Sequence, residues 1–168
     1  MRLSILFAVL AYLALAIETS IPYWVQTRVL IPNLIVILAV DLGLRHHGVI
    51  PALIAFAMGY ATDAFSGSAL GINAFLITAV YLLTYEISSR LLVTNAAVGA
   101  TFVFVGVIVT SVGALVLGDG SAGFAAVGPM LTSFAANAAI SALVAPAVFR
   151  FVAILKRMVG LPVSLARE

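Results

Sequence analysis

The sequence predicts an all-α integral membrane protein, with one polytopic membrane domain over residues 1–168. Hydrophobic residues make up 64% of the 168 positions and charged residues only 8%, whereas a typical soluble domain has about 25% charged residues. A membrane-spanning helix needs about 20 apolar residues, and the charged residues divide this chain into six apolar runs. We therefore expect about six transmembrane helices, which leave no room for a separate soluble domain.

The first three apolar runs are short, and the last three are each long enough to span a bilayer. In chain order, the runs are residues 3–17, 29–40, 48–62, 64–85, 91–118 and 120–149. Because 29–40 and 48–62 fall below the usual spanning length, we expect Asp41 and the segment that follows Asp63 to lie near or inside the headgroup region. A re-entrant second or third segment is the alternative.

The basic residues predict the orientation, because cytoplasmic loops are enriched in Lys and Arg. With a cytoplasmic amino terminus and six crossings, only Arg28 is external. The cytoplasmic basic residues are then Arg2, Arg45, Arg90, Arg150, Lys156, Arg157 and Arg167. Both termini are expected in the cytoplasm. The first run also resembles a signal peptide, but its removal would break this arrangement.

Two acidic residues each precede an arginine by four positions at a predicted cytoplasmic helix end. These pairs are Asp41 with Arg45 and Glu86 with Arg90, in the favourable orientation for an i,i+4 ion pair. The simpler interpretation is two snorkelling pairs at the inner interface. The alternative, that Asp41 or Glu86 lines an ion path, would need more buried charge than the sequence offers.

Spacing and sidedness argue against an enzyme. His46 and His47 are adjacent in a predicted inner loop, whereas Asp63 and Ser66 are predicted at the outer surface, roughly 30 Å away. A catalytic triad cannot form across that distance, and nucleotide-binding and cysteine motifs are absent from the sequence. We expect no catalytic group, cofactor or metal site, and the net charge of +2 gives no reason to expect nucleic acid.

Two periodic patterns predict helix contacts in the last two runs. Gly99, Gly106 and Gly113 recur every seven residues and so share one helix face, which another helix can approach closely. That helix is either part of the same bundle or a partner's transmembrane helix. Ser133 and the polar residues four and eight positions later, Asn137 and Ser141, form a stripe that suits an internal hydrogen-bonding seam or a lined cavity.

The segment from Asp63 to Asn73 is the part of the chain that lipid does not explain. Its glycines and serines suit a tight turn that caps the next helix, with Ser or Asn side chains accepting from free backbone amides. A turn accounts less well for an acid, two serines and an asparagine in one short connection. A structural turn and a functional site are both open at this point.

The layout resembles the rod-shape-determining protein MreD family. The most specific likeness is the motif Asp63-x-x-Ser66-Gly67-x-x-Leu70-Gly71-x-Asn73-Ala74, and a shorter one is Pro32-Asn33-Leu34, where Asn33 replaces an Asp common in the family. The likeness covers most of the chain. The glycine-rich fifth run matches only in being apolar.

This resemblance implies a non-enzymatic scaffold subunit of the bacterial elongation (rod) complex, located in the inner (cytoplasmic) membrane. It implies a role in cell shape and lateral-wall peptidoglycan synthesis. The implied partners are an MreC-like bitopic protein, a RodA-type glycosyltransferase with its transpeptidase, membrane lipid and, indirectly, the MreB filament. The family is also similar in fold to the substrate-binding subunits of energy-coupling-factor vitamin transporters, which supply the alternative function. Their docking pattern of alanines four residues apart is absent from the first run.

We therefore expect the protein to work by packing. Either the glycine face at Gly99, Gly106 and Gly113 or the turn from Asp63 to Asn73 would dock a partner's transmembrane helix or external segment.

Overall fold

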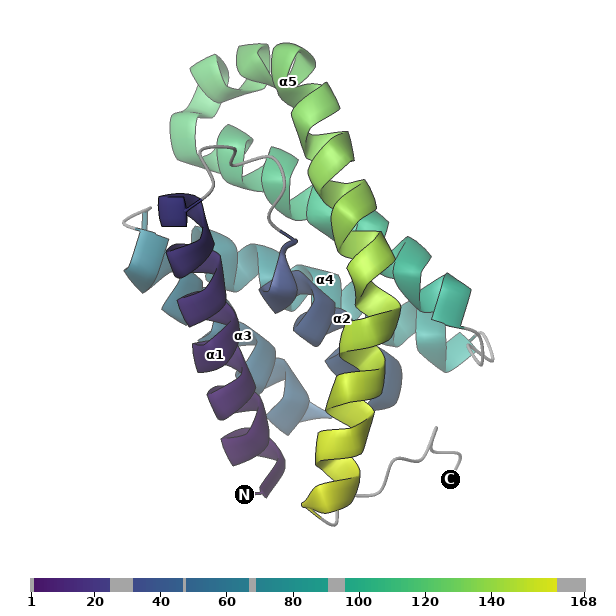
Figure 1. The fold of residues 1–168 in the computed structure, drawn as a ribbon. Helices are drawn as coiled ribbons and strands as arrows, with labels where there is room; N and C mark the ends of the chain where they lie inside the picture. The colour runs from purple at the N-terminus through teal and green to yellow at the C-terminus, as the bar shows by residue number, and fades with distance from the viewer. Residues whose placement is uncertain (1, 25–31, 47, 67–68, 91–95, 160–168) are drawn as a thin grey trace.

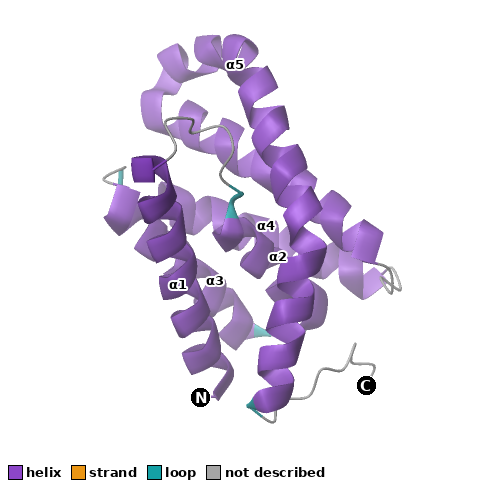
Figure 2. Ribbon diagram, viewed as in Figure 1, coloured by secondary structure: helices purple, strands orange, loops and turns teal. Residues whose placement is uncertain are grey.

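The computed structural model describes residues 2–24, 32–46, 48–66, 69–90 and 96–159. These residues are helical apart from short loops (Figure 2), which confirms the all-α prediction. In chain order the helices are α1 (Arg2–Trp24), α2 (Leu34–Arg45), α3 (Val49–Ser66), α4 (Ile72–Arg90) and α5 (Ala96–Met158).

Helix α5 holds two of the predicted spans in one continuous helix of 63 residues. Figure 1 shows that α5 bends sharply and folds back on itself. The expected helix boundary at Asp119 is therefore wrong, because the backbone there is helical and satisfies its own polar groups while the chain reverses. We call residues 97–118 and 130–158 the first and second arms of α5. The arms pack together away from the bend, where the Phe149 ring lies beside Gly99.

The expected six crossings need a correction at α2. Among the described residues, five segments are long and apolar enough to cross a membrane, and two of them belong to α5. Helix α2 has only 12 residues, or about 18 Å at 1.5 Å per residue, against a hydrocarbon core of about 30 Å. The beginning of α1 and the end of α5 lie at the same end of the bundle (Figure 1).

Helix α2 forms the centre of the bundle. Its nine consecutive residues from Ile35 to Gly43 are all buried, and side chains of α2 belong to both hydrophobic clusters of the core. A helix that is apolar on every face is expected where protein surrounds it completely. Asp41 is one of these buried residues, so protein side chains surround it, and its expected depth near the headgroups stays a prediction.

Helices α3 and α4 form a close hairpin. Helix α3 continues to Ser66, four residues beyond the predicted end of its run, because Asp63 lies within the helix. A Cβ at Gly59 would be 2.5 Å from the Ala74 Cα, a distance that real side chains do not show. The absence of a side chain at Gly59 lets α3 pack directly against the first turn of α4.

Candidate functional site

The carboxylate of Asp63 caps the amino terminus of α4. Its Oδ2 accepts hydrogen bonds from the backbone N–H groups of Gly71 at 2.9 Å and Ala74 at 3.1 Å. Its Oδ1 accepts from the Asn73 backbone N–H at 3.1 Å and from the Asn73 side-chain Nδ2 at 3.0 Å. Since the side chain is only 1% exposed, these donors replace water around the charge.

The other residues of this motif serve the same turn. Gly71 has a φ of +102°, a backbone conformation that favours glycine. The Ser66 hydroxyl donates a long hydrogen bond of 3.4 Å to the Asp63 carbonyl, and Leu70 is 66% exposed, whereas Gly67 lies outside the described residues. The capped turn is thus present, and among the described residues the capping side chain is Asp63; Ser68 lies outside them.

The glycine face of α5 packs inside the bundle. A Cβ at Gly113 would lie 2.5 Å from Leu76 of α4, and a Cβ at Gly106 would lie 3.1 Å from Val80 of the same helix. Gly99 is buried against the second arm of α5. Of the two alternatives for this face, the structure shows the internal contact. The chain's own Phe149 and Leu76 side chains occupy this face at Gly99 and Gly113. Gly106 also lines an open groove between α4 and α5, so docking of a partner helix there stays a prediction.

A second polar seam holds the amino terminus of α2. Glu18 of α1 accepts hydrogen bonds at Oε1 from the backbone N–H groups of Leu34 and Ile35, at 2.5 Å and 3.4 Å. The Asn33 side chain caps the same helix, and its backbone N–H donates to the Ser141 hydroxyl of α5 at 2.9 Å. Ser141 in turn donates to Asn137 at 3.4 Å, so these two members of the predicted stripe form an internal seam.

Three charged side chains meet at the opposite end of α2. Asp41 Oδ1 lies 2.7 Å from Arg45 Nε, which is the predicted i,i+4 pair. Asp41 Oδ2 lies 2.6 Å from Lys156 Nζ of α5. Both Asp41 and Lys156 are fully buried, and the ammonium lies 5.0 Å from the centre of the Phe7 ring, within cation–π range. The expected snorkelling pair at the interface is therefore wrong for Asp41.

Sequence reasoning missed Lys156 because it was counted only as part of a basic carboxyl-terminal end. A signal was present in the spacing. Ala145, Phe149, Val152 and Lys156 follow one another at intervals of four, three and four, and all four are buried. A lysine on the buried face of an apolar helix needs a counter-ion. That counter-ion is Asp41. The sequence pattern placed Asp41 at a helix end near the headgroups, so it did not predict the pair of Asp41 with Lys156.

The predicted histidine turn also packs against the bundle. The ring of His46 lies edge-on to Phe7 of α1, with centroids 6.4 Å apart. The Tyr81 hydroxyl of α4 donates to the carbonyl of His46 at 3.2 Å or of Gly48 at 3.3 Å. His46 and Asp63 lie at opposite ends of α3, and His47 is outside the described residues. The structure thus does not bring a histidine to the acid that the sequence singled out.

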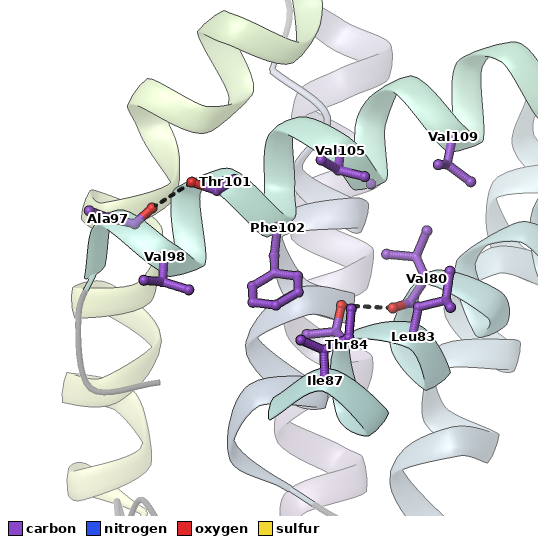
Figure 3. Close-up of a pocket in the computed structure, with 11 residues that line it drawn as sticks. Val80, Leu83, Thr84, Ile87, Ala97, Val98, Thr101, Phe102, Val105 and Val109 are labelled. Atoms are coloured by element: carbon purple, nitrogen blue, oxygen red, sulfur yellow. Dashed lines mark hydrogen bonds between the residues drawn. The ribbon is translucent and has the colours of Figure 1, made fainter. Parts of the chain in front are cut away.

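The surface carries two open apolar grooves. One, of about 510 Å³, lies between α4 and the first arm of α5. Figure 3 shows Phe102 and Val105 on one wall facing Thr84 and Ile87 on the other. The second groove, of about 500 Å³, lies between α1 and α3. We call them the α4/α5 groove and the α1/α3 groove.

Small residues line both helices of the α1/α3 groove. On α1 these are Ser4, Ala8 and Ala11, and on α3 they are Ala57 and Ala61. Ser4 and Ala8 are four residues apart, as are Ala57 and Ala61, and small residues at this spacing let another helix approach closely.

The comparison with protein families agrees with this architecture. A family model described as rod shape-determining protein MreD matches residues 2–159. No curated protein and no solved structure matches the chain, so the likeness to vitamin-transporter subunits stays a prediction, and no observation favours that alternative function. The match spans nearly the whole chain, including the capped turn and the buried α2. The chain therefore belongs to the MreD family of rod-shape-determining membrane proteins.

Proposed function

We propose that this protein is a non-enzymatic scaffold subunit of the bacterial elongation complex in the inner membrane, with both termini in the cytoplasm. It supports cell shape and lateral-wall peptidoglycan synthesis by binding an MreC-like bitopic protein and a RodA-type glycosyltransferase with its transpeptidase. The MreB filament is linked to it indirectly. The family match carries this proposal. The half-buried acid Glu18 and the buried acids Asp41 and Asp63 each hold helices together, which suits a protein that works by packing.

The α1/α3 groove is the docking surface that we propose for the single transmembrane helix of the MreC-like partner. Its small side chains on two neighbouring helices suit close helix packing in lipid, where van der Waals contact drives association. Phe65, which is 60% exposed and follows Asp63 in the family motif, also lines this groove. The groove thus ends beside the motif. The α4/α5 groove also has small side chains, among them Ala97, Thr101 and Gly106, but none of the residues that line it belongs to the Asp63 motif.

Co-purification of the MreC-like partner with groove-filling variants tests this proposal. Ala57→Leu places a larger side chain in the α1/α3 groove, and the matched control Ala97→Leu does the same in the α4/α5 groove. Both alanines are exposed on their helices, so each protein should insert and fold. We expect Ala57→Leu to lower partner recovery about tenfold, the effect of roughly 1.4 kcal/mol, and Ala97→Leu to leave recovery unchanged.

Three outcomes separate the parts of this proposal. Equal recovery with Ala57→Leu and the wild type would refute the α1/α3 groove as the docking surface. A loss of partner recovery only with Ala97→Leu would indicate that the partner docks in the α4/α5 groove. Failure of the wild-type chain to recover any MreC-like or RodA-type partner, and to restore rod shape in a strain that lacks the gene, would refute the scaffold function itself.

A further inference from the structure

The charged cluster at the end of α2 contains more positive than negative charge. Asp41 has one carboxylate, and its two oxygens contact different cations, Lys156 at 2.6 Å and Arg45 at 2.7 Å. Within the described part of the chain these are the ion pairs that the cluster makes, so two cations share one anion. The cluster therefore carries one excess positive charge beside a low-dielectric interior, where uncompensated charge is costly.

The two cations differ in what they can reach. Lys156 is fully buried, and its ammonium lies between Asp41 and the Phe7 ring. It is therefore the counter-ion that the buried carboxylate requires. The Arg45 side chain is 23% exposed and contacts Asp41 through Nε. A guanidinium has five N–H donors, so its terminal nitrogens retain donors for an anion that approaches from outside the bundle.

The surroundings of Arg45 suit a lipid more than a soluble ion. Arg45 is the last residue of α2, and α3 begins four positions later at Val49. The Val49 side chain is 76% exposed. An arginine at a helix end, four positions before an exposed aliphatic side chain, offers a charged contact to a headgroup and an apolar contact to the start of an acyl chain.

We propose that Arg45 binds the phosphate of an anionic phospholipid at the end of the bundle where α1 begins and α5 ends. Arginine recognises phosphate through paired N–H donors, and basic sites between transmembrane helices bind anionic headgroups. The phosphate supplies the second negative charge of the cluster. This inference does not depend on the scaffold function or on either groove.

Thermal unfolding of the purified full chain in a neutral detergent tests the proposal. Phosphatidylglycerol is the probe, and phosphatidylcholine and inorganic phosphate are the comparisons. We expect phosphatidylglycerol to raise the unfolding temperature of the wild type, since a ligand that binds only the folded state stabilises it. Phosphatidylcholine and inorganic phosphate should each give little or no rise.

Two arginine variants locate the effect. Arg45→Gln should abolish the rise with phosphatidylglycerol, yet unfold near the wild-type temperature without lipid, because Asp41 and Lys156 remain as a neutral pair. Arg150→Gln is the matched control, since Arg150 is an exposed arginine on α5, and it should retain the full rise. An unchanged rise in Arg45→Gln, or an equal loss in both variants, would overturn the proposal.

The measurements with the other ligands distinguish a lipid phosphate from free inorganic phosphate. A rise with inorganic phosphate as large as that with phosphatidylglycerol would overturn the lipid assignment in favour of a free anion site. If Arg45→Gln yields no folded protein, native mass spectrometry of the wild type provides the test. Retention of phosphatidylglycerol at a collision energy that strips phosphatidylcholine supports the site, and equal retention of the two lipids overturns it.

Discussion

Asp63 and Asp41 are two buried carboxylates that the protein stabilises in different ways. Within the described residues, Asp63 accepts hydrogen bonds from residues 8 to 11 positions later in the chain, at the start of α4. Asp41 contacts two side-chain cations, and one of them is 115 positions away on α5. The Asp63 site is thus a local cap of partial charges, and the Asp41 site is a long-range pair of full charges.

The difference predicts which site tolerates change. Backbone N–H groups left without Asp63 can turn to other acceptors near the end of the bundle, where Ser66 and Leu70 are exposed. Lys156 is fully buried and has no such access. Loss of the carboxylate should therefore be far more costly at Asp41 than at Asp63. Three substitutions, taken from the largest expected effect to the smallest, test this comparison.

Asp41→Asn should be the most destabilising, by about 3–5 kcal/mol, because removal of one partner leaves a buried charge uncompensated. The measurement is reversible unfolding in mixed micelles. The double variant Asp41→Asn with Lys156→Met removes both buried charges and should recover most of that loss, since the two changes act on one interaction. Additive losses in the double variant would contradict the pairing of Asp41 with Lys156.

Asp63→Ala should destabilise the protein by about 1–2 kcal/mol, the usual effect of removing a helix cap. Hydrogen exchange should rise at the first turn of α4, at Gly71, Asn73 and Ala74, whose N–H groups lose their acceptor. Ser66→Ala is the control within the same turn, because its hydrogen bond to the Asp63 carbonyl is long, and it should change little. Faster exchange spread evenly along α4 would instead indicate loss of packing.

Glu86→Gln should have the smallest effect, within about 0.5 kcal/mol, as for other exposed charges. Glu86 and Arg90 have the same spacing as Asp41 and Arg45, but Glu86 is exposed on α4, and the Arg90 side chain lies outside the described residues. Chemical unfolding of Glu86→Gln beside Asp41→Asn measures the contrast. A loss of several kcal/mol at Glu86 would show that the shared spacing, and not burial, decides the effect.

The sequence predicted features that depend on composition or on neighbours in the chain. Apolar composition indicated the all-α membrane fold, and the short motif that begins at Asp63 indicated a capped turn. The i,i+4 spacing indicated the contact between Asp41 and Arg45, which the structure confirms at 2.7 Å. The motif and the i,i+4 pair each involve only residues within about three helical turns, and the composition needs no knowledge of contacts.

Features that depend on the packing of distant helices could not be predicted in this way. The position of α2 inside the bundle made Asp41 a buried residue that pairs with Lys156 of α5, and no pattern in its own short run indicated that pair. The seven-residue spacing of Gly99, Gly106 and Gly113 correctly predicted a helix face that makes close contacts. The sequence could not show whether those contacts were internal. Only the fold reveals that Leu76, Val80 and Phe149 of the same chain lie against that face.

The central position of α2 has a consequence for synthesis. Helix α2 leaves the ribosome long before the second arm of α5, which carries both Ser141 and Lys156, its hydrogen-bonding and ionic partners. Until that arm is made, a helix too short to span the bilayer holds Asp41 with Arg45 but without Lys156. The nascent protein thus contains a segment that the translocon or a chaperone must shelter, and insertion of the last helix is the step that completes its assembly.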